Sequence, residues 1–192
     1  MVKMNVFDRI YLLASPYLQT RSNGIHIAVS KRFGESLLLT EKGDPEIVIP
    51  AILLHDVGWS KLTEEMQNKA FGPGSDKSLN RIHEVEGVKI AAGILAEVNF
   101  DKTKAEEIIN IIDGHDSRLT TISDNDMIVK DSDKLFRFTC EGLIFYLNTL
   151  KGTVEERLVW LSTKVDCWLF TQAAKVMAWE ELDKRKRNIV NK

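Results

Sequence analysis

Apolar residues recur along this chain three and four positions apart, the spacing that places them on one face of an α-helix. Two clear stripes are Val29, Phe33 and Leu37, and Ile108, Ile111 and Ile112. Convincing stretches of the strict alternation typical of β-strands do not occur in the sequence. The pattern therefore predicts an all-α protein.

Capping residues and prolines indicate where the predicted helices begin and end. Ser22 or Asn23 caps the second helix, and Asp44 followed by Pro45 opens the third. Pro50 lies inside that third helix, so we expect a kink or a later start there. The predicted helices cover approximately residues 6–15, 23–37, 45–55, 63–70, 80–98, 101–115, 127–150 and 153–183, with a glycine-rich loop at 71–76.

Residues 1–192 are expected to form a single domain, because no internal repeat and no linker interrupts the pattern. The motifs that carry chemistry fall between about residues 22 and 138, and helices within 139–192 are expected to complete the bundle. Trp160, Trp168 and Trp179 in this C-terminal part could cover either the bundle or a second subunit, so a homodimer is an open option.

Composition narrows the range of partners. With 44% hydrophobic and 28% charged residues and a net charge of −2, the chain shows no excess of positive charge for binding nucleic acid. Neither a signal peptide nor an apolar run of about 20 residues is seen, so we predict a cytoplasmic protein without membrane contact.

Cys140 and Cys167 lie in apolar helical stretches, so both are predicted to be buried thiols.

All four histidines lie in apolar helical contexts and are candidate metal ligands: His26, His55, His83 and His115. Asp56 directly follows His55 and adds a carboxylate. Imidazole nitrogens and carboxylate oxygens together suit Zn, Mn, Fe and Ni, and they leave room for a water molecule that the metal activates. These residues predict a metal-dependent enzyme.

Helix geometry constrains how the carboxylates can reach a metal. His55 and Asp56 point about 100° apart on a regular helix, but both can reach one ion if the helix ends near Gly58. Asp131 and Asp133 point about 200° apart, so only one of them can face inward. Both have apolar neighbours at helical spacing, so the periodicity leaves that choice open.

The order of these residues resembles the HD superfamily of metal-dependent phosphohydrolases. Three segments carry the resemblance: Ala51-Ile-Leu-Leu-His-Asp-Val-Gly58, Asn110-Ile-Ile-Asp-Gly-His115-Asp116 and Lys130-Asp-Ser-Asp-Lys-Leu135. They are similar to the A-x-L-L-H-D-I-G, I-x-x-H and D-A-D-R-L segments of the family. With His26 they extend over more than half of the chain, and four elements in family order are a specific signal.

The resemblance implies an all-α HD-domain helical bundle with a metal at its centre. The implied ligands are His26, His55, Asp56 and Asp133. In the family the second aspartate of the D-x-D pattern binds the metal, which favours Asp133 over Asp131.

His83 and His115 occupy places where relatives with two metals carry additional ligands. They are therefore expected either to bind a second metal or to contact the substrate phosphate. The implied cofactor is one or two divalent transition metal ions, namely Mn, Fe, Co, Ni or Zn, with Mg as a further option.

Basic residues near these ligands are candidate substrate contacts. Lys61 matches a position where relatives often carry a lysine that meets a substrate phosphate. Lys61 and Asp56 are therefore the catalytic candidates, with Asp56 orienting the attacking water. Arg118, Lys134 and Arg137 flank the predicted ligands and could neutralise a phosphate.

The resemblance implies hydrolysis of a phosphate ester or anhydride by metal-activated water. Among phosphorylated small molecules, a nucleotide is the favoured substrate. Two alternatives stay open at this point. One is an HD-type di-iron oxygenase, which uses the same ligand types, and the other is a non-catalytic regulatory module that binds a metal or a nucleotide.

Overall fold

Helices form all of the regular structure in residues 4–21, 23–70, 74–149 and 152–190, which are the ranges that the computed structural model describes. This confirms the predicted all-α class. Ser22, one of the two predicted caps, and residues 71–73 of the predicted loop lie outside these ranges. No helix in the described ranges is both long and apolar enough to cross a lipid bilayer.

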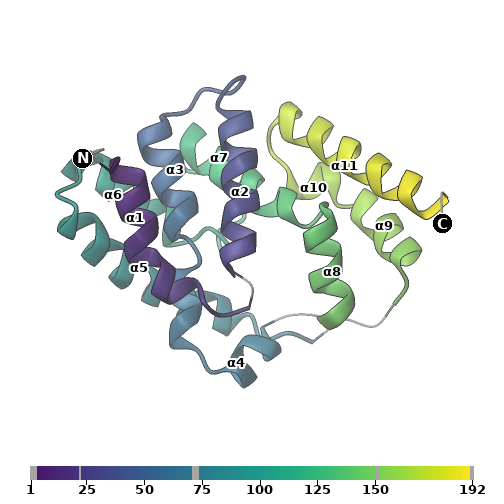
Figure 1. Ribbon diagram of the computed structural model, residues 1–192, viewed down its shortest axis with the longest axis horizontal. Helices are drawn as coiled ribbons and strands as arrows, with labels where there is room; N and C mark the ends of the chain where they lie inside the picture. Colours follow the sequence, from purple (N-terminus) through teal and green to yellow (C-terminus); the bar gives the residue numbers. More distant parts are fainter. Residues whose placement is uncertain (1–3, 22, 71–73, 150–151, 191–192) are drawn as a thin grey trace.

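Helix α3 (Pro45–Leu54) lies at the centre of an N-terminal bundle, and every residue from Ile47 to Leu54 is buried. Its neighbours are α1 (Val6–Ala14), α2 (Asn23–Leu37), α6 (Lys102–Ile112) and α7 (Asp124–Phe136) (Figure 1). The long helix α5 (Ser78–Glu97) packs along α6 and against the 3₁₀ helix η2 (Val57–Lys61). The short η1 (Ser15–Leu18) and α4 (Glu64–Lys69) complete this part.

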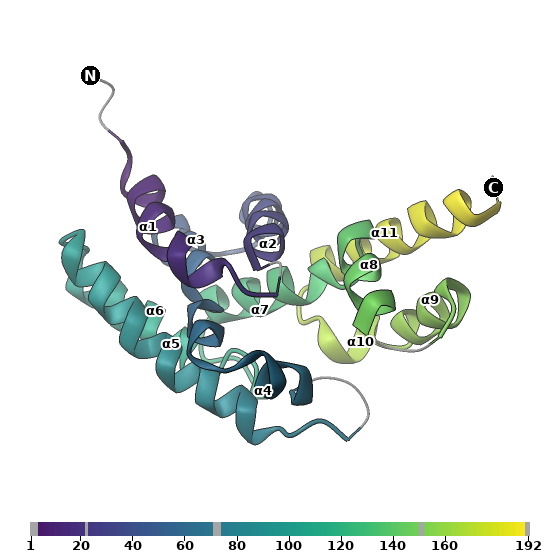
Figure 2. The ribbon, with the colours of Figure 1, turned by 60° about the horizontal axis from the view of Figure 1, so that its bottom comes forward.

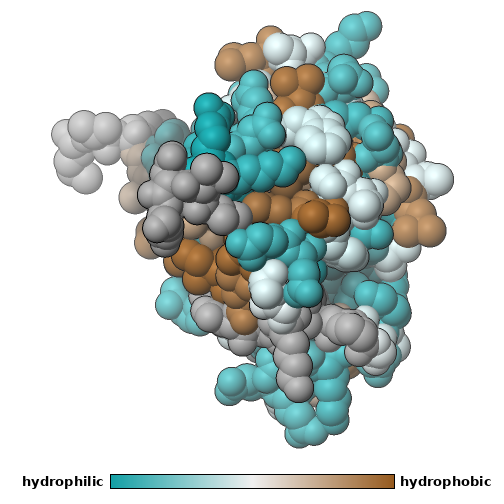
Figure 3. All heavy atoms as spheres, turned by 90° about the vertical axis from the view of Figure 1, so that its right-hand side faces the viewer, coloured by the Kyte–Doolittle hydropathy of each residue, from teal (hydrophilic) through white to brown (hydrophobic). Residues whose placement is uncertain are grey.

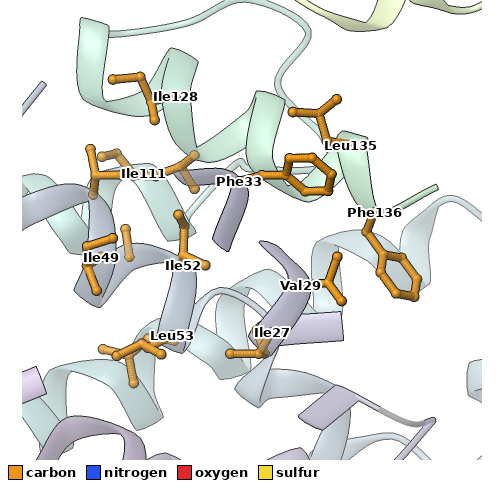
Figure 4. Packing of buried hydrophobic residues seen from close by; sticks show 14 of the residues in the cluster. Ile27, Val29, Phe33, Ile49, Ile52, Leu53, Ile111, Ile128, Leu135 and Phe136 are labelled. Carbon is orange, nitrogen blue, oxygen red and sulfur yellow. The ribbon is translucent and has the colours of Figure 1, made fainter. Parts of the chain in front are cut away.

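Side chains from four helices meet in the hydrophobic core (Figure 4). Phe33 comes from α2, Ile52 and Leu53 from α3, Ile111 from α6 and Ile128 from α7, and none is more than 6% exposed. Burying a side chain of this size stabilises the fold by about 1.5–3 kcal/mol. The core thus holds α2, α3 and α7, which carry the candidate ligands, in one arrangement.

Local caps set the start of α3 as predicted. The Asp44 side chain accepts a hydrogen bond from the Glu46 N–H at 2.8 Å, and Pro45 occupies the first turn. The helix continues through Pro50, so a later start is wrong. The cap at Asp44 and the preset φ of Pro45 stabilise the earlier start.

The long helices predicted at 127–150 and 153–183 are each broken, which corrects that part of the prediction. Helix α7 ends at Phe136, and α8 (Cys140–Thr149) follows Thr139, whose hydroxyl accepts a hydrogen bond from the Gly142 N–H at 3.1 Å. The second stretch forms α9 (Val154–Ser162), α10 (Val165–Trp168) and α11 (Gln172–Val190).

A buried carboxylate on α7 sets the break between α10 and α11. Asp131 accepts hydrogen bonds from the Phe170 N–H at 2.8 Å and from the N–H and hydroxyl of Thr171 at 2.9 and 2.8 Å. These bonds satisfy donors in the two residues just before α11, outside the helix's own hydrogen-bond pattern. Asp131 therefore ties the C-terminal helices to the N-terminal bundle.

Helices α8 to α11 lie beside the N-terminal bundle, on the right in Figure 1. Figure 2 shows the same separation from another direction. Their surface mixes polar and apolar side chains (Figure 3), and Trp160, Phe170 and Trp179 are each about 40% exposed.

Cys140 and Cys167 are both exposed, so the prediction of buried thiols is wrong. The breaks between the helices turn both positions toward solvent. The single domain and the homodimer stay predictions.

Candidate metal centre

His55 and Asp56 lie where α3 ends. His55 is the last residue with a helical backbone, and Asp56 leaves the helix with φ −102° and ψ 3°. The 3₁₀ helix η2 begins at Val57, so α3 ends close to Gly58, as the sequence predicts. Both side chains consequently reach the same interior position, with His55 1% and Asp56 8% exposed.

The four predicted ligands of the first metal converge from α2, the end of α3 and α7. The Nε2 atoms of His26 and His55 are 3.1 Å apart. His26 Nε2 also lies 3.5 Å from Asp56 Oδ2 and 3.3 Å from Asp133 Oδ1. Metal bonds of about 2.0–2.2 Å place neighbouring ligand atoms roughly 3.0–3.5 Å apart. The spacing of this donor set therefore fits a divalent cation.

The hydrogen bond of His55 selects the ring tautomer that a metal needs. His55 Nδ1 lies 2.8 Å from the carbonyl oxygen of Ile52. Because a carbonyl oxygen only accepts, Nδ1 carries the hydrogen, and Nε2 of the neutral ring presents a lone pair toward His26. His115 is held in the same way, with Nδ1 3.0 Å from the Ile112 carbonyl oxygen.

A second group of donors adjoins the first through Asp56. The Nε2 atoms of His83 and His115 are 3.1 Å apart, and Asp56 Oδ1 lies 3.9 and 3.7 Å from them. Asp116 Oδ2 lies 3.8 Å from His83 Nε2 and 4.0 Å from His115 Nε2. One carboxylate thus faces two pairs of histidines, and each pair could hold a cation with it.

Electrostatics favour the ionised form of both central carboxylates. Burial opposes the charge on Asp56, but His55 and the nearby His115 hold the pKa of that carboxyl well below its usual range. Burial also opposes the charge on Asp133, yet Lys134 keeps its pKa well below the usual range. Both side chains are therefore anionic at neutral pH, the form that binds a cation.

The two histidines of the second group differ in protonation. Burial and the neighbouring His115 lower the pKa of His83 to about 4, so its ring is neutral. Burial opposes charge on His115 as well, but Asp56 and Asp116 raise its pKa to about 9. A cation that binds there displaces the proton of His115.

Gly58 allows η2 to lie directly against α5. A Cβ atom at this position would come within 1.9 Å of the His83 carbonyl oxygen and 2.5 Å of the Gly87 nitrogen. The ring of Trp59, the next residue, is buried and stacks on the His83 ring with centroids 4.0 Å apart. This close approach places His83 beside Asp56.

A buried glutamate positions the turn that carries His115. Glu84, fully buried on α5, accepts hydrogen bonds from the N–H groups of Asp116 and Ser117 at 2.9 and 2.7 Å. It also accepts a bond from the Ser117 hydroxyl at 2.7 Å. The turn after α6 is thereby bound to the helix that carries His83.

A recess of about 50 Å³ opens over the donor groups. Its lining comprises Arg21, Asn23, His26, Asp56, Trp59, Asp116, Asp133, Phe136, Arg137, Phe145 and Tyr146. Six lining residues were not predicted as site residues, namely Arg21, Asn23, Asp116, Phe136, Phe145 and Tyr146. Asp116 could have been suspected because it follows His115, but the others reach the site through packing that no local pattern indicates.

The predicted basic residues divide into two pairs. Arg137 lines the recess, and Lys134 binds Asp116 at 3.0 Å and Asp133 at 2.6 Å. Arg118 instead donates to the Asn110 carbonyl at 2.7 Å, and Lys61 is exposed. The structure does not bring Arg118 and Lys61 into the lining of the recess.

The two aspartates that periodicity could not separate have different surroundings. Asp133 lies in the donor group, 3.3 Å from His26 Nε2, while Asp131 binds the backbone at the start of α11. This geometry favours Asp133 as the metal ligand.

The sequence model of the HD domain family matches residues 26–137, more than half of the 192-residue chain. The matched segment contains all four histidines together with Asp56 and Asp133. No curated protein and no solved structure matches the chain significantly. The family match and the buried cluster of histidines and aspartates agree, and the chain belongs to the HD domain family.

Proposed function

We propose that this chain is a metal-dependent phosphohydrolase that cleaves a phosphate ester or anhydride, with a nucleotide as its substrate. The observation that carries the proposal is the pair of donor groups that share Asp56 beneath a recess lined by two arginines, Arg21 and Arg137. Membership of the HD domain family supports it.

Two sets of side chains would hold the cations. The first set is His26, His55, Asp56 and Asp133, and the second is Asp56, His83 and His115. When bound, a divalent cation lowers the pKa of a water molecule toward neutrality and polarises a phosphoryl oxygen. The alternative role for His83 and His115 is to donate hydrogen bonds to the substrate phosphate.

The remaining steps fall to side chains around the recess. Asp56 accepts a hydrogen bond from the attacking water and orients it toward phosphorus. Arg137 offsets the negative charge on the non-bridging phosphate oxygens. Lys134 keeps Asp133 and Asp116 ionised.

Aromatic side chains at the recess support a nucleotide as substrate. Phe145 and Tyr146 from α8 belong to the lining, and an aromatic face there can stack on a base. A cytoplasmic location and the absence of a nucleic-acid partner stay predictions.

The test starts from protein that has been freed of metal and reloaded separately with Mn, Fe, Co, Ni, Zn or Mg. We expect phosphate release from nucleotides with at least one metal. Asp56→Ala should abolish release and lose the metal, with helical content near wild type by circular dichroism. The matched control is Asp183→Ala, at an exposed aspartate on α11, which should retain activity.

Three results would contradict the proposal. Asp56→Ala that keeps its metal and turns over within tenfold of wild type would remove Asp56 from the site. Oxygen consumption by the iron-loaded protein without phosphate release would instead support the oxygenase, and ligand binding without either reaction would support a regulatory module.

A further inference from the structure

Arg21 has a strained backbone and lies outside the segment that matches the family. It precedes α2, and its φ of 55° lies in the left-handed region, which is costly for a residue other than glycine. Strained residues persist where their surroundings hold them, and they cluster at ligand sites. The Arg21 guanidinium lies 4.6 Å from the centroid of the Trp59 ring and 5.6 Å from that of Phe145. The two aromatic rings thus position this cation at the recess that it lines.

Arg137 brings a second guanidinium to the same recess. It donates a hydrogen bond to the Tyr146 hydroxyl at 2.5 Å, and its guanidinium lies 5.4 Å from the centroid of the Trp168 ring. Within the described part of the chain, no carboxylate lies within ion-pair distance of it. Lys134 differs, because it pairs with both Asp116 and Asp133. Arg137 therefore has no direct ion pair within the described residues, and its remaining N–H donors can bind an anion in the recess.

We propose that Arg21 and Arg137 form a clamp for a terminal phosphate group, so that the substrate carries one ester or anhydride link and phosphodiesters bind more weakly. A terminal phosphate carries close to two negative charges near neutral pH, because its second pKa is about 6. A diester carries one. Two guanidinium groups, each able to bind two phosphate oxygens, match the dianion. The inference rests on the proposed hydrolytic function.

Arg21→Asn tests the clamp, because asparagine tolerates the left-handed backbone while the guanidinium is lost. The matched control is Arg32→Gln. Arg32 is an exposed arginine on α2 whose guanidinium lies 5.2 Å from the Phe33 ring centroid, away from the recess. The probes are phenyl phosphate and diphenyl phosphate, with binding measured by calorimetry on the full, zinc-loaded chain and turnover measured with each metal.

Wild type and the control should bind phenyl phosphate at least tenfold more tightly than diphenyl phosphate. Arg21→Asn should weaken the binding of phenyl phosphate about 10- to 100-fold, the loss typical of a charged hydrogen bond. Its affinity for diphenyl phosphate should stay within threefold of the wild-type affinity. Arg21→Lys, which keeps a charge, should lie between the two, and it serves if the asparagine variant fails to fold.

Equal binding of the two probes by wild type, or an equal loss of both in Arg21→Asn, would overturn the clamp. Turnover tests the hydrolytic function separately from the clamp. If no phosphate ester is hydrolysed with any metal, the hydrolytic function fails, while the binding preference still shows whether the recess selects a terminal phosphate.

Discussion

Asp56 is the residue on which both donor groups depend. Its Oδ2 faces His26 at 3.5 Å, its Oδ1 faces His115 at 3.7 Å, and the Trp59 indole N–H donates to Oδ1 at 3.0 Å. Sequence reasoning could place Asp56 beside His55, because adjacent residues at a helix end are a local feature. The residue pattern alone could not show that His115 shares the carboxylate, since that depends on how α5, α6 and η2 pack, and only the resemblance to two-metal relatives suggested it.

The pair Asp131 and Asp133 provides a matched test of two single residues on α7. Asp133→Asn should lose the metal, because the amide is a neutral and weaker ligand than the carboxylate. Asp131→Asn should keep the metal but lower the free energy of unfolding by about 1–3 kcal/mol, since it removes charged acceptors from three hydrogen bonds. Metal analysis and urea unfolding check both variants. Loss of metal in Asp131→Asn alone would contradict the assignment.

At the scale of helices, the boundaries that depend on local chemistry could be predicted. The starts at Asp44 and Thr63 follow from side chains that cap the next turn, which is visible in the sequence. The break before α11 could not be predicted, because it depends on Asp131, 39 residues away from Phe170 in the chain. Apolar residues continue across such breaks, so periodicity alone joins the helices into one.

The contact between η2 and α5 gives a prediction for two glycines. Gly58→Ala should lower the free energy of unfolding by about 1–3 kcal/mol, because the added methyl group meets the His83 carbonyl and the backbone must shift. Gly93→Ala is the control on α5, where an added Cβ meets nothing within 4 Å. It should raise stability by about 0.5–1 kcal/mol. Equal effects in thermal unfolding would show that the close approach at Gly58 is absent.

At the scale of the whole molecule, the family pattern accounts for the donor groups but not for the recess above them. Residues 26–137 supply the histidines and aspartates. Arg21 comes before that segment, and Phe145 and Tyr146 come after it. No motif relates these flanking residues to the site, because they meet only when α8 packs beside α2 and α7. The features proposed to select the substrate are therefore those that the sequence indicates least.

Metal binding should also stabilise the whole bundle, because the proposed ligands come from α2, α3, α5, α7 and the turn after α6. A free metal concentration 100 times the Kd adds about 2.7 kcal/mol of stability. For a chain of this size, that should raise Tm by about 5–10 °C. Calorimetry before and after chelation measures the shift. An unchanged Tm, with metal content confirmed, would place the ion outside the bundle.

A crystal structure of the manganese-loaded chain with anomalous scattering is the most direct test of the proposed metal centre. We expect two anomalous peaks about 3.5–4 Å apart, one beside His26, His55 and Asp133 and the other beside His83 and His115, with Asp56 between them. A single peak beside His26, His55 and Asp133 would assign His83 and His115 to the substrate phosphate, whereas no peak beside Asp56 would contradict the metal centre itself.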